Sequence, residues 1–212
     1  MSKYYFHFTS DKLRNGSPIP PVGEWLVFPG KPIICEQGLH ASEHPFDALQ
    51  YAPGNNLHIV ELRGITDKHL DKVVAKERKI VTSIDAEDLL YRCSRKFALD
   101  VIHLWNPPQI VLDYLKTGNK SIRKAAGDAA WAAAEDAAGA ATGAAAGAAA
   151  RAAAWAAAGA VAWSAAWAAA RAATGAAAWS AAWAAAGVAQ REYFLNEVKE
   201  EFRKQAHFSF GE

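Results

Sequence analysis

The chain of 212 residues carries 23 Lys and Arg residues against 22 Asp and Glu residues, a formal net charge of +1. This length fits one domain with an extension or two small domains, and the balanced charge excludes the overall basic field of many nucleic-acid-binding proteins. Cys35 and Cys93 are too few for a disulfide framework, and residues 1–16 lack the apolar stretch of a secretory signal, so we expect a cytoplasmic protein.

Composition divides the chain into four segments. Residues 1–82 have the mixed composition of a small α+β domain, to which we assign ligand recognition, and residues 83–124 are expected to form connecting helices. Residues 125–190 are mostly alanine, and residues 191–212 are again highly charged. The expected fold class is α+β, with the small mixed domain followed by an Ala-rich all-α repeat region of packed helices.

The first segment contains short strands separated by turns. A strand is expected over residues 3–9, and a turn-rich connection rich in Pro and Gly follows over residues 11–25. Further strands are expected over four ranges, of which 57–64 has the clearest pattern: 25–28, 32–35, 57–64 and a stretch within 71–84. One or two helical turns lie within residues 43–54 and are stopped by Pro53 and Gly54.

From Ser83 onward the apolar residues recur at helical spacing. They are Leu89, Leu90, Cys93, Phe97, Val101 and Leu104. Pro107 and Pro108 end this helix, and a second helix over residues 109–118 is closed by Gly118.

The Ala-rich segment is a tetrad repeat in which nearly every fourth residue is Gly, Trp, Arg or Glu. Alanine is the best helix former, and no proline interrupts the run. Because each residue turns an α-helix by about 100°, a step of four drifts by about 40°. A single straight helix would wind this stripe around its surface, so we expect breaks, with Gly143, Gly159 and Gly175 as candidate positions.

Three structures remain open for this segment. The first is a bundle or hairpin of packed helices that self-associates, with these interaction residues: Trp131, Trp155, Trp163, Trp167, Trp179, Trp183, Arg151 and Arg171. The second is a membrane-associated helix pair, because residues 152–170 and 172–190 lack charge. The third is an elongated rod. Alanine favours insertion into a membrane only marginally, and the Trp residues do not gather at the two ends of a membrane span. Packed helices are therefore favoured.

The last segment has the pattern of an amphipathic helix. Its apolar side is formed by Phe194, Val198 and Phe202, which we expect to dock on the domain or on a partner. Its exposed face is expected to carry Glu197, Lys199, Glu200, Glu201, Arg203 and Lys204.

Motifs for common chemistry are missing from the sequence. It has no CxxC pair, HExxH motif, Walker loop or Rossmann fingerprint, so no metal site is predicted. A basic run of Lys72, Lys76, Arg78 and Lys79 is most simply a solvated face, with phosphate binding as the alternative.

Two histidines have contexts that favour ligand binding. His7 lies in FHFTS, next to the hydroxyl of Thr9, and His40 lies in GLHAS, between Gly38 and Ser42. Tyr51, in DALQYA, is a third candidate, although its apolar neighbours also suit a core residue. A lone histidine is more often structural than functional, so the prediction depends on these residues meeting in one pocket.

The order FHFTS, GLHAS, DALQYA and LHIVELRG resembles the first half of the ADP-ribosyltransferase core. The resemblance implies that His7 would bind the nicotinamide ribose of NAD or a related nucleotide. His40 would stand where the family has a tyrosine that stacks on nicotinamide. Glu77 is the candidate for the catalytic glutamate on a later strand.

A second resemblance covers nearly the whole chain. The stretch GKPIICEQGLHASEHPFDALQYAPG, the helix around LLYRCSRKFALDVI and the Ala/Trp/Arg tetrads are similar, in order and wording, to an uncharacterised family found mainly in phages and prophages. Some members are labelled immunity proteins. This resemblance implies a phage or mobile-element origin and a place in the host cytoplasm, but it supplies no reaction.

Three functions therefore follow as hypotheses. The leading one is a non-catalytic accessory protein that binds a host factor or a small nucleotide-type ligand through its N-terminal domain and forms a homo-oligomer through its tail. The second is an NAD-dependent ADP-ribosyltransferase-like enzyme, which needs an acid within reach of the His7 and His40 pocket. The third is a structural or membrane-associated helical protein, whose N-terminal pocket would be filled by its own side chains.

Overall fold

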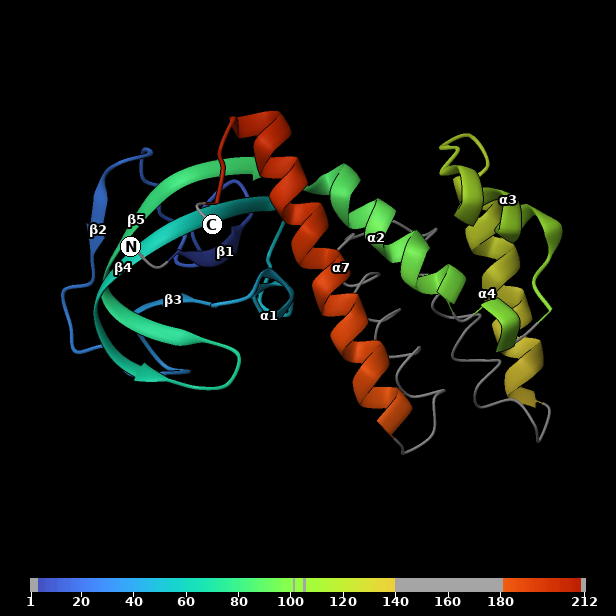
Figure 1. Cartoon of the computed structure of the whole chain (residues 1–212), viewed down its shortest axis with the longest axis horizontal. Coiled ribbons are helices and arrows are strands. Elements are labelled where there is room, and N and C mark those ends of the chain that lie inside the picture. The colour runs from blue at the N-terminus through green and yellow to red at the C-terminus, as the bar shows by residue number, and fades with distance from the viewer. Residues whose placement is uncertain (1–3, 101, 105, 140–180, 211–212) are drawn as a thin grey trace. The chain divides into compact units, whose positions relative to one another are not determined.

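A computed structural model describes residues 4–100, 102–104, 106–139 and 181–210 of the chain (Figure 1). These residues form two compact units, the first over Met1–Glu87 with Phe194–Glu212 and the second over Asp88–Tyr193. Helices accompany an antiparallel sheet, which confirms the α+β class.

Five strands form the sheet of the first unit. They are β1 (Tyr5–Thr9), β2 (Trp25–Val27), β3 (Leu39–Ala41), β4 (Asn56–Lys68) and β5 (Val73–Asp85). The order is β1-β4-β5-β2, β3 also pairs with β5, and these pairings are antiparallel. The β4–β5 hairpin has 13 residues in each strand and runs through the middle of the sheet.

The strands predicted over 3–9, 25–28 and 57–64 and within 71–84 are confirmed, with shifted ends. The predicted strand over 32–35 is wrong. Ile33 and Gln37 exchange backbone hydrogen bonds of 2.8 and 2.9 Å around a tight turn, and Cys35 within it has a φ of 69°. The apolar run is therefore bent back on itself and pairs locally rather than with a neighbouring strand.

The short helix predicted within residues 43–54 is α1 (Pro45–Leu49). The His44 side chain caps it by accepting a hydrogen bond of 3.1 Å from the Phe46 amide, and Pro45 occupies the first turn. The helix ends at Leu49, before Pro53 is reached.

The C-terminal part of α7 (Ala181–Ala206) packs against this sheet. Phe194, Val198 and Phe202 are fully buried, which confirms the predicted docking of the apolar side on the domain. Beyond the helix, the ring of Phe208 lies 5.4 Å from that of Tyr4. Glu201 was expected on the exposed face, but it is only 9% exposed and accepts a hydrogen bond of 2.8 Å from Gln205.

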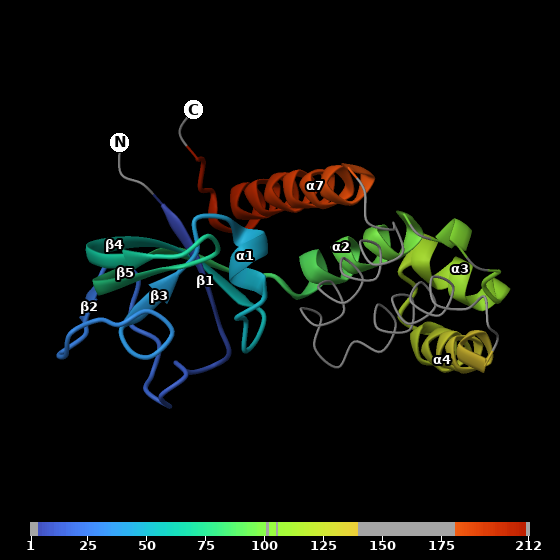
Figure 2. The same cartoon turned by 90° about the horizontal axis from the view of Figure 1, so that it is seen from below.

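Two long loops lie on the other side of the sheet. Figure 2 shows residues 10–24 and 28–38 on the side opposite to the C-terminal part of α7. Loop 10–24 is the predicted turn-rich connection. These two loops and the sheet enclose the cavity described below.

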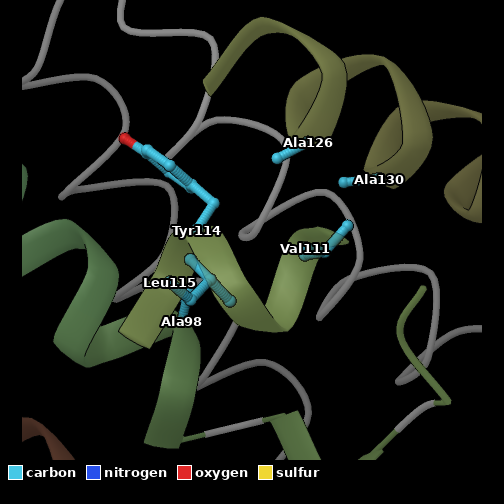
Figure 3. Close-up of a cluster of buried hydrophobic side chains, with 6 residues drawn as sticks. All are labelled: Ala98, Val111, Tyr114, Leu115, Ala126 and Ala130. Carbon is cyan, nitrogen blue, oxygen red and sulfur yellow. The ribbon is translucent and has the colours of Figure 1, made fainter. Parts of the chain in front are cut away.

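The second unit is helical. It holds α2 (Glu87–Asp100), the 3-10 turn Ile102–Leu104, α3 (Gln109–Thr117) and α4 (Arg123–Gly139). Side chains from α2, α3 and α4 form one buried cluster, drawn in Figure 3 and composed of Ala98, Val111, Tyr114, Leu115, Ala126 and Ala130. Because β5 continues to Asp85, the first of these helices begins at Glu87 rather than at Ser83.

The two predicted connecting helices are present in this unit, but the first ends at Asp100, and a 3-10 turn over Ile102–Leu104 stands between it and Pro107 and Pro108. Leu89, Leu90, Cys93 and Phe97 are buried along α2, as their spacing predicted, whereas Val101 lies outside the described residues. Gly118 closes α3 with a φ of 66°, and a β-carbon there would come within 2.6 Å of the Arg95 guanidinium.

The Ala-rich segment is described only at its two ends. Helix α4 and the start of α7 are helical, as alanine predicts. Residues 140–180 lie outside the described residues, and with them lie these predicted break points and interaction residues: Gly143, Gly159, Gly175, Arg151, Arg171, Trp155, Trp163, Trp167 and Trp179. Trp131 on α4 is 40% exposed, and Trp183 falls in the first turn of α7.

Among the helices described, none combines the length and the apolar character needed to cross a membrane. The two charge-free stretches on which the membrane alternative depends, 152–170 and 172–190, lie largely outside this part of the chain.

Candidate functional site

One cavity of about 1150 Å³ lies within the first unit, between the sheet and loops 10–24 and 28–38. All six residues predicted to bind a ligand line it: His7, Thr9, Gly38, His40, Ser42 and Tyr51. They come from β1, from β3 with its flanking residues and from the turn after α1. The pocket on which the sequence prediction depended is therefore present.

Strand geometry positions the β1 residues. His7 and Thr9 are two residues apart, so their side chains share one face of the sheet. The register of β1 with β4 places His7 opposite His58, and the two imidazole rings stack with centroids 6.3 Å apart.

His58 is only 3% exposed and lies at the centre of a chain of hydrogen bonds. Its Nε2 lies 2.8 Å from the Thr9 hydroxyl, and its Nδ1 lies 2.6 Å from the Ser83 hydroxyl. Burial, and then the nearby Arg78 charge, lower the pKa of His58 to about 4. Burial and Arg78 also hold the pKa of His7 well below its ordinary value. Both imidazoles are neutral at pH 7, and His7, which lines the cavity, offers it a neutral hydrogen-bonding group.

A glycine and a tight turn position His40 on β3. Gly38 has a φ of 115°, and a β-carbon there would lie 2.7 Å from the Val74 side chain. The Nε2 of His40 accepts a hydrogen bond of 3.2 Å from the backbone amide of Cys35. Burial lowers the pKa of His40, so this ring is also biased toward its neutral form. Ser42, which follows β3, exchanges backbone hydrogen bonds of 2.8 and 2.9 Å with Phe6.

Tyr51 is held from two sides. Its hydroxyl donates a short hydrogen bond to the Asp71 carboxylate, which also accepts one of 2.9 Å from Gln50. The ammonium group of Lys72 lies 4.4 Å from the centre of its ring. Burial and the bond to Asp71 raise the pKa of Tyr51. Tyr51 is half-buried at the cavity rather than a core residue.

Glu77, the acid that the ADP-ribosyltransferase resemblance suggests, is not among the residues that line the cavity. It lies on β5 opposite Arg63 of β4 and Val27 of β2. Two other acids, Glu24 and Glu36, do line the cavity and come from its loops. Sequence reasoning missed both, because turn residues carry no periodic signal that shows where their side chains point.

The basic run at residues 72–79 is not a uniform solvated face. Lys79 pairs with Glu61 at 2.7 Å, and the Lys76 ammonium donates to the Gly30 carbonyl at 2.7 Å. Arg78 is only 6% exposed, lines the cavity and donates from Nη1 to the His40 carbonyl at 2.9 Å. The signal for this burial is present in the sequence, since Arg78 stands two residues before the buried Ile80 in a strand.

Within the described parts of the chain, no group of His, Cys, Asp or Glu side chains is placed to hold a metal ion. The side chains that line the cavity include hydroxyls, imidazoles and cations, together with the carboxylates of Glu24 and Glu36.

The antiparallel sheet and its cavity define an α+β domain with one large cavity against the sheet. Residues 4–92 match the model of a family described as a domain of unknown function, DUF7666. The match runs from β1 into α2 and includes every residue that lines the cavity. No curated protein and no solved structure matches the chain.

Proposed function

We propose that the protein is a non-catalytic accessory binding protein whose N-terminal domain binds a small nucleotide-type ligand in this cavity. The observation that carries the proposal is the convergence of His7, His40 and Tyr51, from three separate parts of the domain, on one cavity. A host factor presenting such a group is the other ligand compatible with the proposal.

The dimensions and chemistry of the cavity support this function. A volume of about 1150 Å³ lies slightly above the usual range for ligand pockets, roughly 300–1,000 Å³, so the cavity has room for a ligand of nucleotide size. Apolar walls such as Trp25 and Phe28 surround a few polar groups, a combination that suits a molecule with an aromatic part. If the protein were instead a structural or membrane-associated helical protein, the pocket would be filled by the domain's own side chains. The open volume of the cavity therefore favours ligand binding.

The proposal extends to the tail and to the origin of the protein. The Ala/Trp tetrads of residues 125–190 would assemble copies of the chain into a homo-oligomer. The resemblance to phage-encoded proteins supports a role in the cytoplasm of a host cell.

An NAD-dependent ADP-ribosyltransferase-like enzyme is the second candidate, and the acids Glu24 and Glu36 at the cavity favour it. Incubation with NAD should then release nicotinamide, and Glu24→Gln or Glu36→Gln should abolish the release. Binding of NAD without release of nicotinamide would contradict the enzyme and support the non-catalytic proposal.

Isothermal titration calorimetry with NAD, ADP-ribose, ADP and adenosine tests the binding proposal. At least one compound should bind saturably. His40→Ala should weaken this binding by roughly 10-fold, since it removes a polar group from the cavity wall. His69→Ala removes an exposed histidine between β4 and β5 and should leave the affinity unchanged. Absence of binding by all four compounds, or equal affinities of the two variants, would contradict the proposal.

A further inference from the structure

Arg78 places a buried positive charge on the wall of the cavity. Its side chain is only 6% exposed, yet no carboxylate in the described part of the chain forms an ion pair with it. Burial lowers the pKa of Arg78 to about 10, so the guanidinium is still a cation at pH 7. An unpaired buried charge is costly, and proteins normally compensate it with an opposite charge.

The hydrogen bonds of Arg78 leave most of its donors available. A guanidinium has about five N–H donors in a planar fork, and here Nη1 donates to the His40 carbonyl at 2.9 Å. This bond fixes the side chain beside His40, at the wall of the cavity. A planar fork held in this way matches a phosphate or carboxylate group, which can accept two parallel hydrogen bonds.

Two more cations line the same cavity. Arg14 reaches it from loop 10–24 and donates to the Tyr51 carbonyl at 3.4 Å. Lys72 lies against the Tyr51 ring. The acids that line the cavity, Glu24 and Glu36, form no ion pair with these cations in the described chain. Three cations thus share one cavity with two neutral imidazoles.

We propose that Arg78, assisted by Arg14 and Lys72, forms a subsite for the anionic group of the ligand, a phosphate or a carboxylate. This inference rests on the proposed binding function and specifies its ligand class, a small molecule that joins an anionic group to an apolar or aromatic part. The aromatic part would contact the apolar walls around Trp25, and the anion would compensate the charge of Arg78.

The test compares Arg78→Met with Lys68→Met. Both changes remove one positive charge from the β4–β5 hairpin, but Lys68 is exposed, pairs with Glu43 and does not line the cavity. The probes are ADP, adenosine, inorganic pyrophosphate and citrate. Binding of each probe is measured by calorimetry and by its effect on the thermal unfolding midpoint of the whole protein. Adenosine lacks the phosphates of ADP, and citrate separates carboxylate recognition from phosphate recognition.

We expect ADP to bind the wild-type protein and Lys68→Met more tightly than adenosine does. Arg78→Met should weaken ADP binding by roughly 30-fold or more, as expected when one partner of a buried charge-assisted contact is removed. Its affinity for adenosine should stay unchanged. Without any ligand, Arg78→Met should unfold at the same or a higher temperature than the wild type, because it removes an uncompensated buried charge. A purely structural arginine would instead lower this temperature.

The outcomes separate this inference from the binding function on which it rests. Equal binding of ADP and adenosine, or unchanged ADP binding by Arg78→Met, overturns the anion subsite and leaves the binding function intact. If neither nucleotide binds but pyrophosphate or citrate raises the unfolding midpoint of the wild type and not of Arg78→Met, the subsite is supported and the nucleotide class is overturned. If no probe binds the wild type, the anion subsite is overturned, and the binding function is overturned with it when NAD and ADP-ribose also fail to bind.

Discussion

The histidines of the sheet show how burial determines the charge of a single residue. His58 is enclosed between β1 and β5, where hydroxyl groups of Thr9 and Ser83 meet its two ring nitrogens. Neither hydroxyl carries a negative charge to stabilise an imidazolium. Desolvation therefore dominates, and the nearby Arg78 charge acts in the same direction.

The low pKa of His58 makes stability depend on pH. Its pKa is about 4 in the folded protein against 6.5 for an ordinary histidine, so between these values the unfolded chain binds more protons than the folded one. Stability is then complete above about pH 6.5 and falls as the pH drops, by about 3 kcal/mol at pH 4 for this residue. His58→Gln removes this titration and should make the dependence less steep, while the contribution of His7 remains.

Hydrogen exchange of the β4 and β5 amides, corrected for intrinsic rates at each pH, measures this effect. The exposed His69 serves as control, and His69→Gln should keep the wild-type dependence. An equal loss of stability between pH 7 and pH 4 in the wild type and His58→Gln would contradict the assignment.

The candidate site could be predicted from local context only where a residue type was unusual for its surroundings. His7, His40 and Tyr51 were singled out in this way, and they line one cavity. Arg78 was grouped with exposed lysines because four basic residues close together resemble a solvated face. Its burial depends on strand phase and on the loops that cover the sheet, and a charge pattern contains neither.

At the scale of whole elements, α7 packs against the sheet and stabilises it, although the helix lies far from the strands in sequence. The ring of Phe202, which is fully buried, lies 6.1 Å from that of Phe210 and 6.4 Å from that of Phe208. Phe210 in turn lies 6.1 Å from Phe6 of β1. The aromatic residues of the C-terminus therefore form a continuous contact with the edge strand.

Phe202→Ala should lower the free energy of unfolding of the first unit by about 3–5 kcal/mol, because it leaves a cavity in this aromatic cluster. The exposed Lys199 on the same helix provides the control, and Lys199→Ala should change stability by less than about 0.5 kcal/mol. Hydrogen exchange of the β4 and β5 amides measures both changes. Protection that is the same in both variants would show that the sheet is stable without α7.

Elements were predictable where a repeating pattern was long. The strand predicted over 57–64 and the helices α2 and α3 follow clear apolar patterns, and the structure contains them. The run at residues 32–35 is apolar but only four residues long, and its backbone closes on itself through Ile33 and Gln37. Short apolar runs do not distinguish a strand from a turn, because pairing depends on which neighbour is available.

At the scale of the whole chain, the first unit joins segments that the sequence separates. Residues 194–212 pack with residues 1–87, although more than a hundred residues lie between them. The amphipathic pattern predicted that Phe194 and its neighbours would dock, but it contained no information on where. In sequence, the Ala-rich segment therefore lies between the helices of the second unit and residues 194–212, which belong to the first unit.

The packing of residues 194–212 with the first unit determines how self-association can be tested. A chain truncated at Lys124 would lose residues 194–212 and with them part of the first unit, so substitutions are preferable to truncation. The variant replaces Trp155, Trp163, Trp167 and Trp179 with alanine, which preserves helix propensity while removing the largest apolar side chains of the repeat. Light scattering without detergent should show a defined oligomer for the wild type and a monomer for the variant.

The light-scattering results decide whether the Ala-rich repeat assembles copies of the chain through its tryptophans. Alanine side chains alone bury little apolar area, so an assembly that depends on the four rings must lose most of its stabilising contacts when they are removed. A wild-type monomer, or an oligomer that persists in the variant, would contradict assembly through these tryptophans. A wild-type chain that stays in solution only with detergent would instead support the membrane alternative, because the charge-free stretches 152–170 and 172–190 would then be held by lipid.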